Sequence, residues 1–481
     1  MAIGVSGADK NDLEIVERGS QTINPPLPNP ENQHFIHNLH QMTPQYLTGK
    51  PLDKLTNLFV ETLCEDIDAR FPPNDPKSYD WETLDLCEFV KTTWAHASIT
   101  SLFGTNIYRI WPEIQKWLWD FDEHFPSLMT KMPRFVLPQA WALRDEGWEK
   151  CAQWEREARA AEATGEFGED PEWDPYWGMK FVRLRAHYIK DSGMSDKVRA
   201  GNQMVFIWGV SQAVYSCTKL HANTLQLNAN AIPIAMQTIT QLVLHPQIHN
   251  AVIQEISEAK TGPTNFDMRK VTSSPRFKSV YIEALRWATA SPSPRVVKHD
   301  VKVGPYTLRR GNMVIVHSRT LQMDSKTWSV PGVPESDPEN FWPERFLSED
   351  DSNTESHSIS ENAEAEANYS NDVLQAKKQD EERRKMQAQE EKVRTLSLRP
   401  FGGGTTLCPG RHFANNEIMG GIAALLLRLE IEVVQEELEK NGVPKPGLKK
   451  QGGLLPDRPL IVRMRRKRVG SHELAAVLRL V

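Results

Sequence analysis

The stretch Phe401-Gly-Gly-Gly-Thr-Thr-Leu-Cys408-Pro-Gly-Arg411 is the feature that most constrains what this chain can fold into. Apolar residues recur after it at steps of three and four, which predicts a helix with one apolar face. These residues are Ile418, Ile422, Leu425, Leu426 and Leu429. Pro409 suits a first helical turn, where its missing N–H needs no partner. Cys408 is therefore expected at or just before the start of this helix.

A cysteine at a helix start has a distinct chemistry. Free backbone N–H groups and the positive end of the helix dipole favour a thiolate over a thiol there. A thiolate is a metal ligand or a nucleophile. The glycines before Cys408 leave the backbone without side chains, so a flat or bulky group can approach the sulfur. Haem held by one cysteine meets this requirement. The alternative is a buried structural cysteine after a glycine-rich turn.

The complete string resembles the haem-binding signature of the cytochrome P450 family, Phe-x-x-Gly-x-x-x-Cys-x-Gly. The resemblance implies haem b (iron protoporphyrin IX) as cofactor and Cys408 as the metal ligand. Many family members carry Arg two residues before the cysteine, where this chain has Thr406, and Arg411 is the candidate to compensate. The predicted cofactor-binding residues are Cys408, Phe401, Gly402, Gly404, Arg295 and Arg411.

Charge and cysteine content narrow the function classes. The 481 residues carry a net charge of -6, which gives no reason to expect a nucleic-acid partner. The five cysteines are scattered and odd in number, which indicates a reducing intracellular compartment without disulfides. No apolar run is long enough for a membrane span, so we expect no transmembrane segment.

The pattern along the chain predicts a mostly α protein with a small β part, which the resemblance identifies as the cytochrome P450 fold. In the family, a membrane anchor, a short helix and much of a small sheet precede the first helix predicted here, so we expect an amino-terminally truncated version. The charged and polar segment 348–396 is expected to be a disordered or partly helical insertion. The predicted divisions are an irregular lead-in (1–31), the main haem domain (32–347), the insertion (348–396), the haem-ligand loop with final helix and closing strands (397–468) and an unassigned tail (469–481).

Hydrophobic periodicity and turn residues predict the individual elements. Two amphipathic helices from Asn32 are separated at 48–51, and a third helix ends at Gly104. The pattern is almost wholly helical from Met194 to about Ala259, with interruptions at Pro233 and at His245-Pro246. The remaining predictions are an exposed loop at 163–178, strands at 301–308 and 312–317 joined through 309–311, and a closing strand after 455.

Asn230 is the predicted catalytic residue. It lies near Pro233, which removes a backbone donor and is expected to kink the helix. The simpler interpretation is that the amide only satisfies carbonyls freed by the kink. By resemblance, a long helix here crosses the distal face of the haem and usually carries an acid–threonine pair, which is missing. The segment Ala229-Asn230-Ala-Ile-Pro233 is similar to the variant in steroid hydroxylases and prostacyclin synthase. We predict that Asn230 holds a water that relays protons.

Glu283 and Arg286 share one face of a short helix that is otherwise apolar around them. Apolar neighbours predict that the pair is buried, and a buried pair needs further hydrogen bonds. Arg345, in Pro-Glu-Arg-Phe, is the expected third partner, and the set resembles the family's structural Glu-Arg-Arg network. The alternative is an exposed, weak ion pair.

Arg295 lies in the proline-rich segment 291–297, which is expected to run extended over the haem edge. Its position matches the family residue that contacts a haem propionate, and a guanidinium suits a carboxylate. The alternative is a solvated loop arginine.

The resemblance implies a monooxygenase that acts with O2 on a lipophilic small molecule, such as a sterol, a terpenoid or another secondary metabolite. Electrons would come from a separate NADPH-cytochrome P450 reductase, because the chain has no Gly-x-Gly-x-x-Gly nucleotide loop. The family also implies the endoplasmic reticulum membrane surface as location. Two alternatives stay open: a haem-thiolate isomerase or dehydratase that needs no reductase, and an inactive, truncated remnant.

Overall fold

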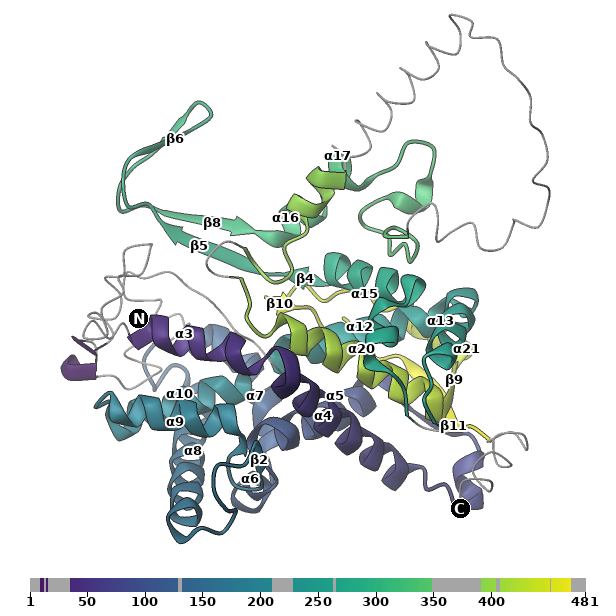
Figure 1. Ribbon diagram of the computed structural model, residues 1–481. Helices are drawn as coiled ribbons and strands as arrows, with labels where there is room; N and C mark the ends of the chain where they lie inside the picture. Colours follow the sequence, from purple (N-terminus) through teal and green to yellow (C-terminus); the bar gives the residue numbers. More distant parts are fainter. Residues whose placement is uncertain are drawn as a thin grey trace, which may run out of the picture.

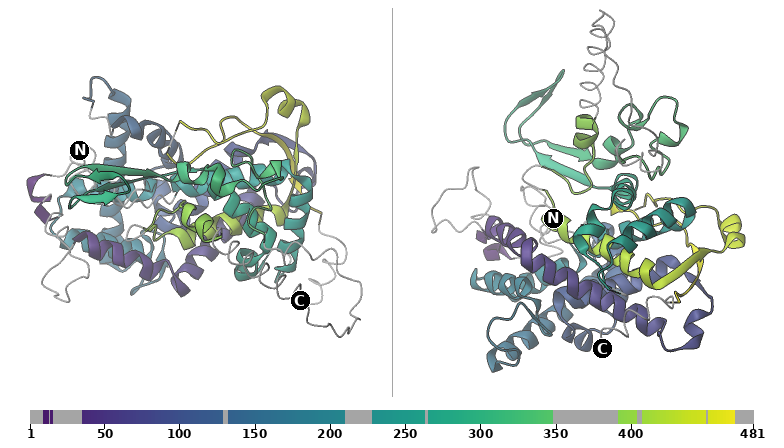
Figure 2. Two further views of the ribbon diagram at one scale, coloured as in Figure 1. Left: turned by 90° about the horizontal axis from the view of Figure 1, so that it is seen from above. Right: turned by 45° about the vertical axis from the view of Figure 1, so that its right-hand side comes forward.

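The computed structural model describes residues 9–12, 14–15, 35–128, 132–209, 228–262, 265–347, 391–403, 407–449 and 451–468. Helices form the body of the molecule, and the sheet of β5 and β8 with the hairpin of β6 projects from it at the upper left of Figure 1. The views in Figure 2 show the same projecting arm. This architecture confirms a mostly α fold with a small β part.

The elements follow in chain order. The helices are α3 (Phe35–Tyr46), α4 (Gly49–Arg70), α5 (Leu86–Phe103), α6 (Asn106–Ile110), α7 (Ile114–Leu128), α8 (Pro138–Thr164), α9 (Lys180–Asp191), α10 (Asp196–Trp208), α12 (Asn228–Leu244), α13 (Pro246–Glu258), α14 (Met268–Ser273), α15 (Pro275–Trp287), α16 (Ser318–Gln322), α17 (Ser325–Trp328), α20 (Arg411–Arg428) and α21 (Gln435–Asn441), with 3-10 turns η1 (Pro76–Tyr79) and η2 (Pro334–Ser336). The strands are β1 (Glu82–Asp85), β2 (Trp173–Asp174), β3 (Gly178–Met179), β4 (Thr289–Ala290), β5 (Pro292–Val296), β6 (Val301–Val303), β7 (Tyr306–Leu308), β8 (Met313–His317), β9 (Leu429–Val433), β10 (Gly452–Gly453) and β11 (Ile461–Arg466).

A group of four helices, α4, α5, α12 and α20, forms the centre of the core. Phe59 of α4 meets Phe413 of α20 edge to face, with ring centroids 6.2 Å apart. A Cβ at Gly421 of α20 would lie 2.6 Å from the ring of Trp94 on α5, so a glycine is needed where these two helices approach. This packing buries apolar side chains around the helix that follows Cys408.

Several predicted helix boundaries are confirmed. α5 ends at Phe103, and Gly104 caps it with φ 79. α20 begins at Arg411, so Cys408 lies just before it. The prediction of an almost wholly helical segment from Met194 is wrong at one point. α10 ends at Trp208 because Gly209 adopts a left-handed conformation with φ 119, and residues 210–227 lie outside the described residues.

Pro233 does not interrupt α12. It lies in the second turn, and the helix continues to Leu244. Pro233 is the sixth residue of α12, beyond the first four N–H groups that lack an intrahelical partner, so it removes one i→i−4 hydrogen bond, and the helix continues without that bond. The predicted break at His245-Pro246 is confirmed, because Pro246 begins α13.

The strand prediction for 301–308 needs correction. This segment forms two strands, β6 and β7, that turn back at Gly304, whose φ of 56 favours glycine. β8 pairs instead with β5, in the register Arg295↔Val314. The two prolines of β5 are tolerated because, among the described residues, β5 pairs along one edge only. The predicted closing strand is β11, which joins β1 and β9 in a three-stranded sheet.

The segment 163–178 is less exposed than its composition suggests. α8 extends to Thr164, and β2 and β3 form a short hairpin with Asp174 and Trp177 buried. The Asp174 carboxylate accepts the backbone N–H groups of Tyr176 and Trp177 at 2.9 and 2.7 Å, which explains why an acid is buried there.

Parts of the lead-in and the insertion are described. Asp12 is buried and accepts hydrogen bonds from the N–H and hydroxyl of Ser195 at 2.8 and 2.7 Å, at the start of α10. Residues 391–397 are helical, and Arg394 Nε donates to the Thr327 carbonyl at 3.2 Å. The rest of the insertion and the tail 469–481 lie outside the described residues.

None of the helices in the described part is long and apolar enough to cross a membrane.

Candidate active site

The backbone around Cys408 forms a closed loop ahead of α20. The Cys408 N–H donates to the Phe401 carbonyl at 2.9 Å, and Gly402 adopts a left-handed φ of 74. The loop is therefore held by its own backbone, with no side chain at Gly402 or Gly403. Gly404, a predicted cofactor-binding residue, lies outside the described residues together with 405 and 406.

The local surroundings oppose ionisation of the free thiol. Desolvation raises the pKa of Cys408 to about 11, although the N–H groups of Gly410 and Arg411 and the Arg411 charge lower it. Burial thus opposes the thiolate that the sequence predicts at this position, and α20 begins three residues after Cys408. A coordinated metal cation deprotonates a thiol outright. The N–H groups on the sulfur suit such a ligand.

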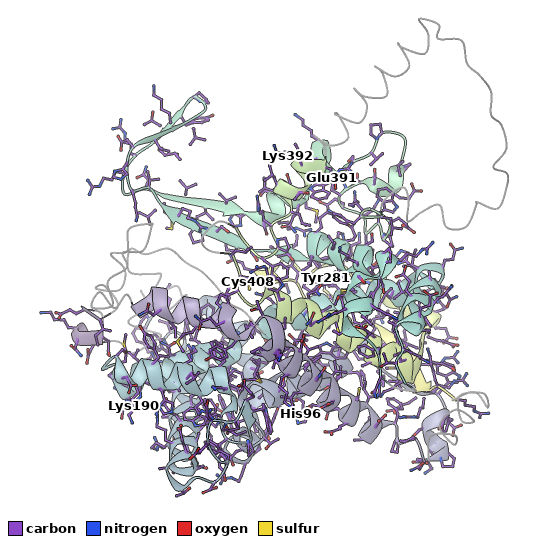
Figure 3. All side chains as sticks on the ribbon, viewed as in Figure 1. His96, Lys190, Tyr281, Glu391, Lys392 and Cys408 are labelled. Carbon is purple, nitrogen blue, oxygen red and sulfur yellow. The ribbon has the colours of Figure 1, made fainter. Side chains whose placement is uncertain are left out.

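Tyr281 is a neighbour of Cys408 that the sequence interpretation missed. Its hydroxyl is buried, burial raises its pKa, and the charges of Cys408 and Glu417 act on it in the same direction. Figure 3 labels its side chain near Cys408 in projection, and the effect of the Cys408 charge on the Tyr281 pKa agrees with this proximity. Tyr281 lies two residues before Glu283, hence on nearly the opposite face of α15. One face of this helix therefore points to the cysteine and the other to the ionic network.

Arginines converge on the glycine loop. Arg295 of β5 donates from Nη2 to the Gly403 carbonyl at 3.5 Å and from Nη1 to the Pro294 carbonyl at 2.8 Å. Arg399, which the sequence interpretation missed, has its Nη1 atom 3.5 Å from the position that a Cβ of Gly403 would take. Arg411 donates from Nη1 to the Cys408 carbonyl at 3.1 Å. The loop thus has a positive border suited to carboxylates.

The structure brings Glu283, Arg286 and Arg345 together in the core. Arg286 donates to both Glu283 oxygens at 2.7 Å, and Arg345 Nε lies 3.1 and 3.0 Å from the same two oxygens. All three residues are buried. The remaining guanidinium N–H groups donate to backbone carbonyls of Gln322, Pro338, Asn340, Trp328, Ser336 and Asp337. The exposed-pair alternative is therefore excluded.

Asn230 lies in the first turn of α12 and faces the carboxyl-terminal part of the chain. Its Oδ1 accepts the backbone N–H of Gly453 in β10 at 2.7 Å. This contact ties the first turn of α12 to β10, a strand far away in the sequence. α12 also contacts α20 and α15, the helices that bear the cysteine loop and the ionic network.

These residues fit a haem. The donor set consists of one cysteine sulfur that receives backbone N–H groups, near Gly402 and Gly403, which have no side chains, and near arginines that border the loop. A haem needs one axial protein ligand, room for a flat macrocycle and cations for its two carboxylates. Cys408 corresponds to the axial ligand, and the arginines correspond to the cations.

The comparison with known protein families agrees with this geometry. The sequence model described as "Cytochrome P450" matches residues 235–463, a range that contains Glu283, Arg345 and Cys408. This range is slightly less than half of the chain, and over it the chain is similar to the cytochrome P450 family. The chain is an oxidoreductase of the cytochrome P450 monooxygenase type, with the haem-thiolate cofactor that this family implies.

Individual P450 relatives extend the likeness to most of the chain. A cytochrome P450 monooxygenase named fsoE from Humicola fuscoatra is 26% identical over 452 residues, covering 90% of this chain and 71% of that protein. The 25-hydroxycholesterol 7-alpha-hydroxylase of Rattus norvegicus is 22% identical, covering 81% of this chain and 80% of its own length. The crystal structure of the haem domain of cytochrome P450DA superimposes with a TM-score of 0.57 at 15% identity, covering 90% of this chain and 77% of that one, which supports the fold.

Proposed function

We propose that this P450 binds haem b through Cys408 and oxidises a lipophilic small molecule with O2. The observation that carries the proposal is the Cys408 sulfur, which receives the N–H groups of Gly410 and Arg411 at the start of α20. When bound, the haem supplies oxygen activation, and electron density from the thiolate favours O–O cleavage.

In this proposal the arginines around the loop hold the two cofactor carboxylates. Arg295 reaches the loop from β5, and Arg399 and Arg411 flank it from either side in the sequence. Arg399 would then supply the charge that many family members place where this chain has Thr406. A guanidinium pairs with a carboxylate through two parallel hydrogen bonds, which would orient the ring as well as attract it.

Asn230 is the proposed polar group on the substrate side. With Oδ1 engaged by Gly453, its Nδ2 group keeps two hydrogens to donate. Such a donor would hold a water molecule and orient it for proton delivery. The segment 228–233 contains neither an acid nor a threonine, and its polar side chains are the carboxamides of Asn228 and Asn230. The hydrogen bond to Gly453 favours Asn230 for this role.

The substrate is proposed to be a sterol, a terpenoid or a related secondary metabolite. Support comes from the relatives, which include fungal P450 monooxygenases and proteins named for hydroxylation of 25-hydroxycholesterol and cholesterol. Electrons are proposed to come from NADPH-cytochrome P450 reductase at the endoplasmic reticulum membrane surface, by analogy with the family.

Reconstitution tests this function. Purified haem-loaded protein should turn over a panel of sterols and terpenoids when NADPH and cytochrome P450 reductase are present, and each omission should stop product formation. The same panel should displace water from the haem and shift its absorbance on binding. Haem-free protein after expression with excess haem precursor would favour the inactive remnant and contradict the proposal.

An isomerase or dehydratase is the second candidate, favoured by the amide in place of an acid–threonine pair. Such an enzyme would rearrange a lipid peroxide without external electrons. Product formed from a peroxide substrate at full rate with no reductase would establish this candidate over the monooxygenase.

A further inference from the structure

One face of α12 is joined to β10 and to the residue that follows it by two hydrogen bonds. The Gly453 N–H donates to Asn230 Oδ1 at 2.7 Å, and Gln237 Nε2 donates to the Leu454 carbonyl at 3.0 Å. Asn230 and Gln237 are seven residues apart, close to two helical turns, so both side chains lie on the same face. Gln237 is fully buried. These bonds connect residues 223 and 217 positions apart in the chain.

The direction of the Gly453 N–H is set by the strand. The Leu454 N–H donates to the Ala288 carbonyl at 2.8 Å, on the side where β10 pairs with β4. The Gly453 N–H leaves the strand toward α12, where it meets Asn230 Oδ1 at 2.7 Å. A backbone N–H can meet only the oxygen of a carboxamide. Because Oδ1 is held there, the Nδ2 group is turned away from β10.

Residue 453 must also be small. A Cβ on Gly453 would lie 2.5 Å from the carbonyl oxygen of Asn230 and 3.1 Å from its Cα. Both atoms belong to the backbone of α12, so no side-chain rotation could relieve the contact. The strand and the helix can approach closely enough for the 2.7 Å hydrogen bond only with glycine at this position.

We propose that Gly453 is a positioning residue for the Asn230 amide: its N–H fixes Oδ1, and its lack of a side chain sets the distance, so that Nδ2 is presented for proton delivery. This rests on the proposed role of Asn230 and adds the group that orients it. Strand β10 thereby takes part in the chemistry through its backbone, because its two residues are glycines and have no side chains.

Hydrogen exchange of the Gly453 amide tests the bond independently of catalysis. In haem-loaded Asn230→Leu the Gly453 amide is expected to exchange about tenfold faster than in the wild type, the effect of losing one hydrogen bond. Asn230→Asp keeps an acceptor of the same shape and should retain protection. Unchanged exchange in Asn230→Leu would overturn the proposal.

The second readout is the C–O stretching frequency of the reduced carbon monoxide complex, which responds to a nearby N–H donor. Gly453→Ala should shift it in the direction seen for Asn230→Asp and Asn230→Leu, and should lower the ratio of product to NADPH consumed several-fold. The matched control is Gly447→Ala. A Cβ at Gly447 would have the Leu455 carbonyl oxygen as its nearest atom, at 3.2 Å, and Asn230 is not among its neighbours.

The outcomes separate the two levels of the proposal. A wild-type frequency and ratio in Gly453→Ala, with haem loading equal to that of Gly447→Ala, would show that the amide does not depend on Gly453. Wild-type ratios in both Asn230 variants, together with faster exchange at Gly453, would refute the catalytic role of Asn230 and the positioning role with it, while leaving the hydrogen bond established.

Discussion

Burial in the core changes the pKa of single ionisable side chains in this protein. Glu417 of α20 is fully buried, and desolvation raises its pKa from 4.5 to about 8, opposed by the Ser98 hydroxyl of α5. In the unfolded chain the same carboxyl is ionised above its ordinary pKa. The folded protein therefore binds more protons than the unfolded chain between these two values, and stability falls as pH rises through this window.

Glu417→Gln should remove that dependence. We expect the variant to be more stable than the wild type at pH 8 by an amount on the order of 4 kcal/mol, with the difference shrinking toward pH 5. The free energy of unfolding in urea at several pH values measures this. Glu439→Gln, at an exposed position, serves as control and should follow the wild type. A wild-type slope in Glu417→Gln would show that Glu417 is not the titrating group.

At the scale of elements, the ionic network holds α15 to the segment that leads toward the cysteine loop. Arg286 and Arg345 share Glu283 and donate to carbonyls on both sides of η2. Burial lowers the pKa of Arg345, and Glu283 opposes that shift. Removal of the carboxylate would leave two buried cations facing each other.

Glu283→Ala should therefore destabilise the fold by about 3–5 kcal/mol. Little soluble, haem-loaded protein is expected, measured as the ratio of haem absorbance to protein at matched expression. Glu335→Ala, an exposed acid in η2, should load haem normally. Full loading of Glu283→Ala with an altered product pattern would mean that the network belongs to the substrate site.

Local patterns predicted those elements whose residues lie close together in the sequence. The helix after Cys408, the Gly104 cap and the Glu283–Arg286 pair each follow from spacing within a few residues. The Gly453–Asn230 bond joins residues 223 positions apart and leaves no local signal. The pairing of β8 with β5 likewise depended on register across a hairpin that composition alone could not reveal.

The electrostatics of Cys408 could not be predicted from its position either, because burial in the assembled fold decides it. Arg399 and Tyr281 were missed for a similar reason. One borders the loop through Gly403 and the other approaches from α15, contacts that only the tertiary structure creates.

At the scale of the whole molecule, the insertion divides the chain between the ionic network and the cysteine loop. Its composition cannot support a core, whereas its last described turn is helical and Arg394 contacts Thr327. We expect replacement of residues 348–390 by a Gly/Ser linker to leave haem loading and the melting temperature unchanged. A longer replacement that also removes Arg394 tests the contribution of the contact. Lost haem loading in the shorter variant would show that the insertion packs on the fold.

The central claim is that Cys408 is the haem ligand, and the reduced carbon monoxide difference spectrum tests it most directly. The wild type and Cys64→Ala, which alters another buried cysteine, should both give the thiolate-type Soret band. Cys408→Ala should lose that band completely. A thiolate-type band that persists in Cys408→Ala would contradict the account.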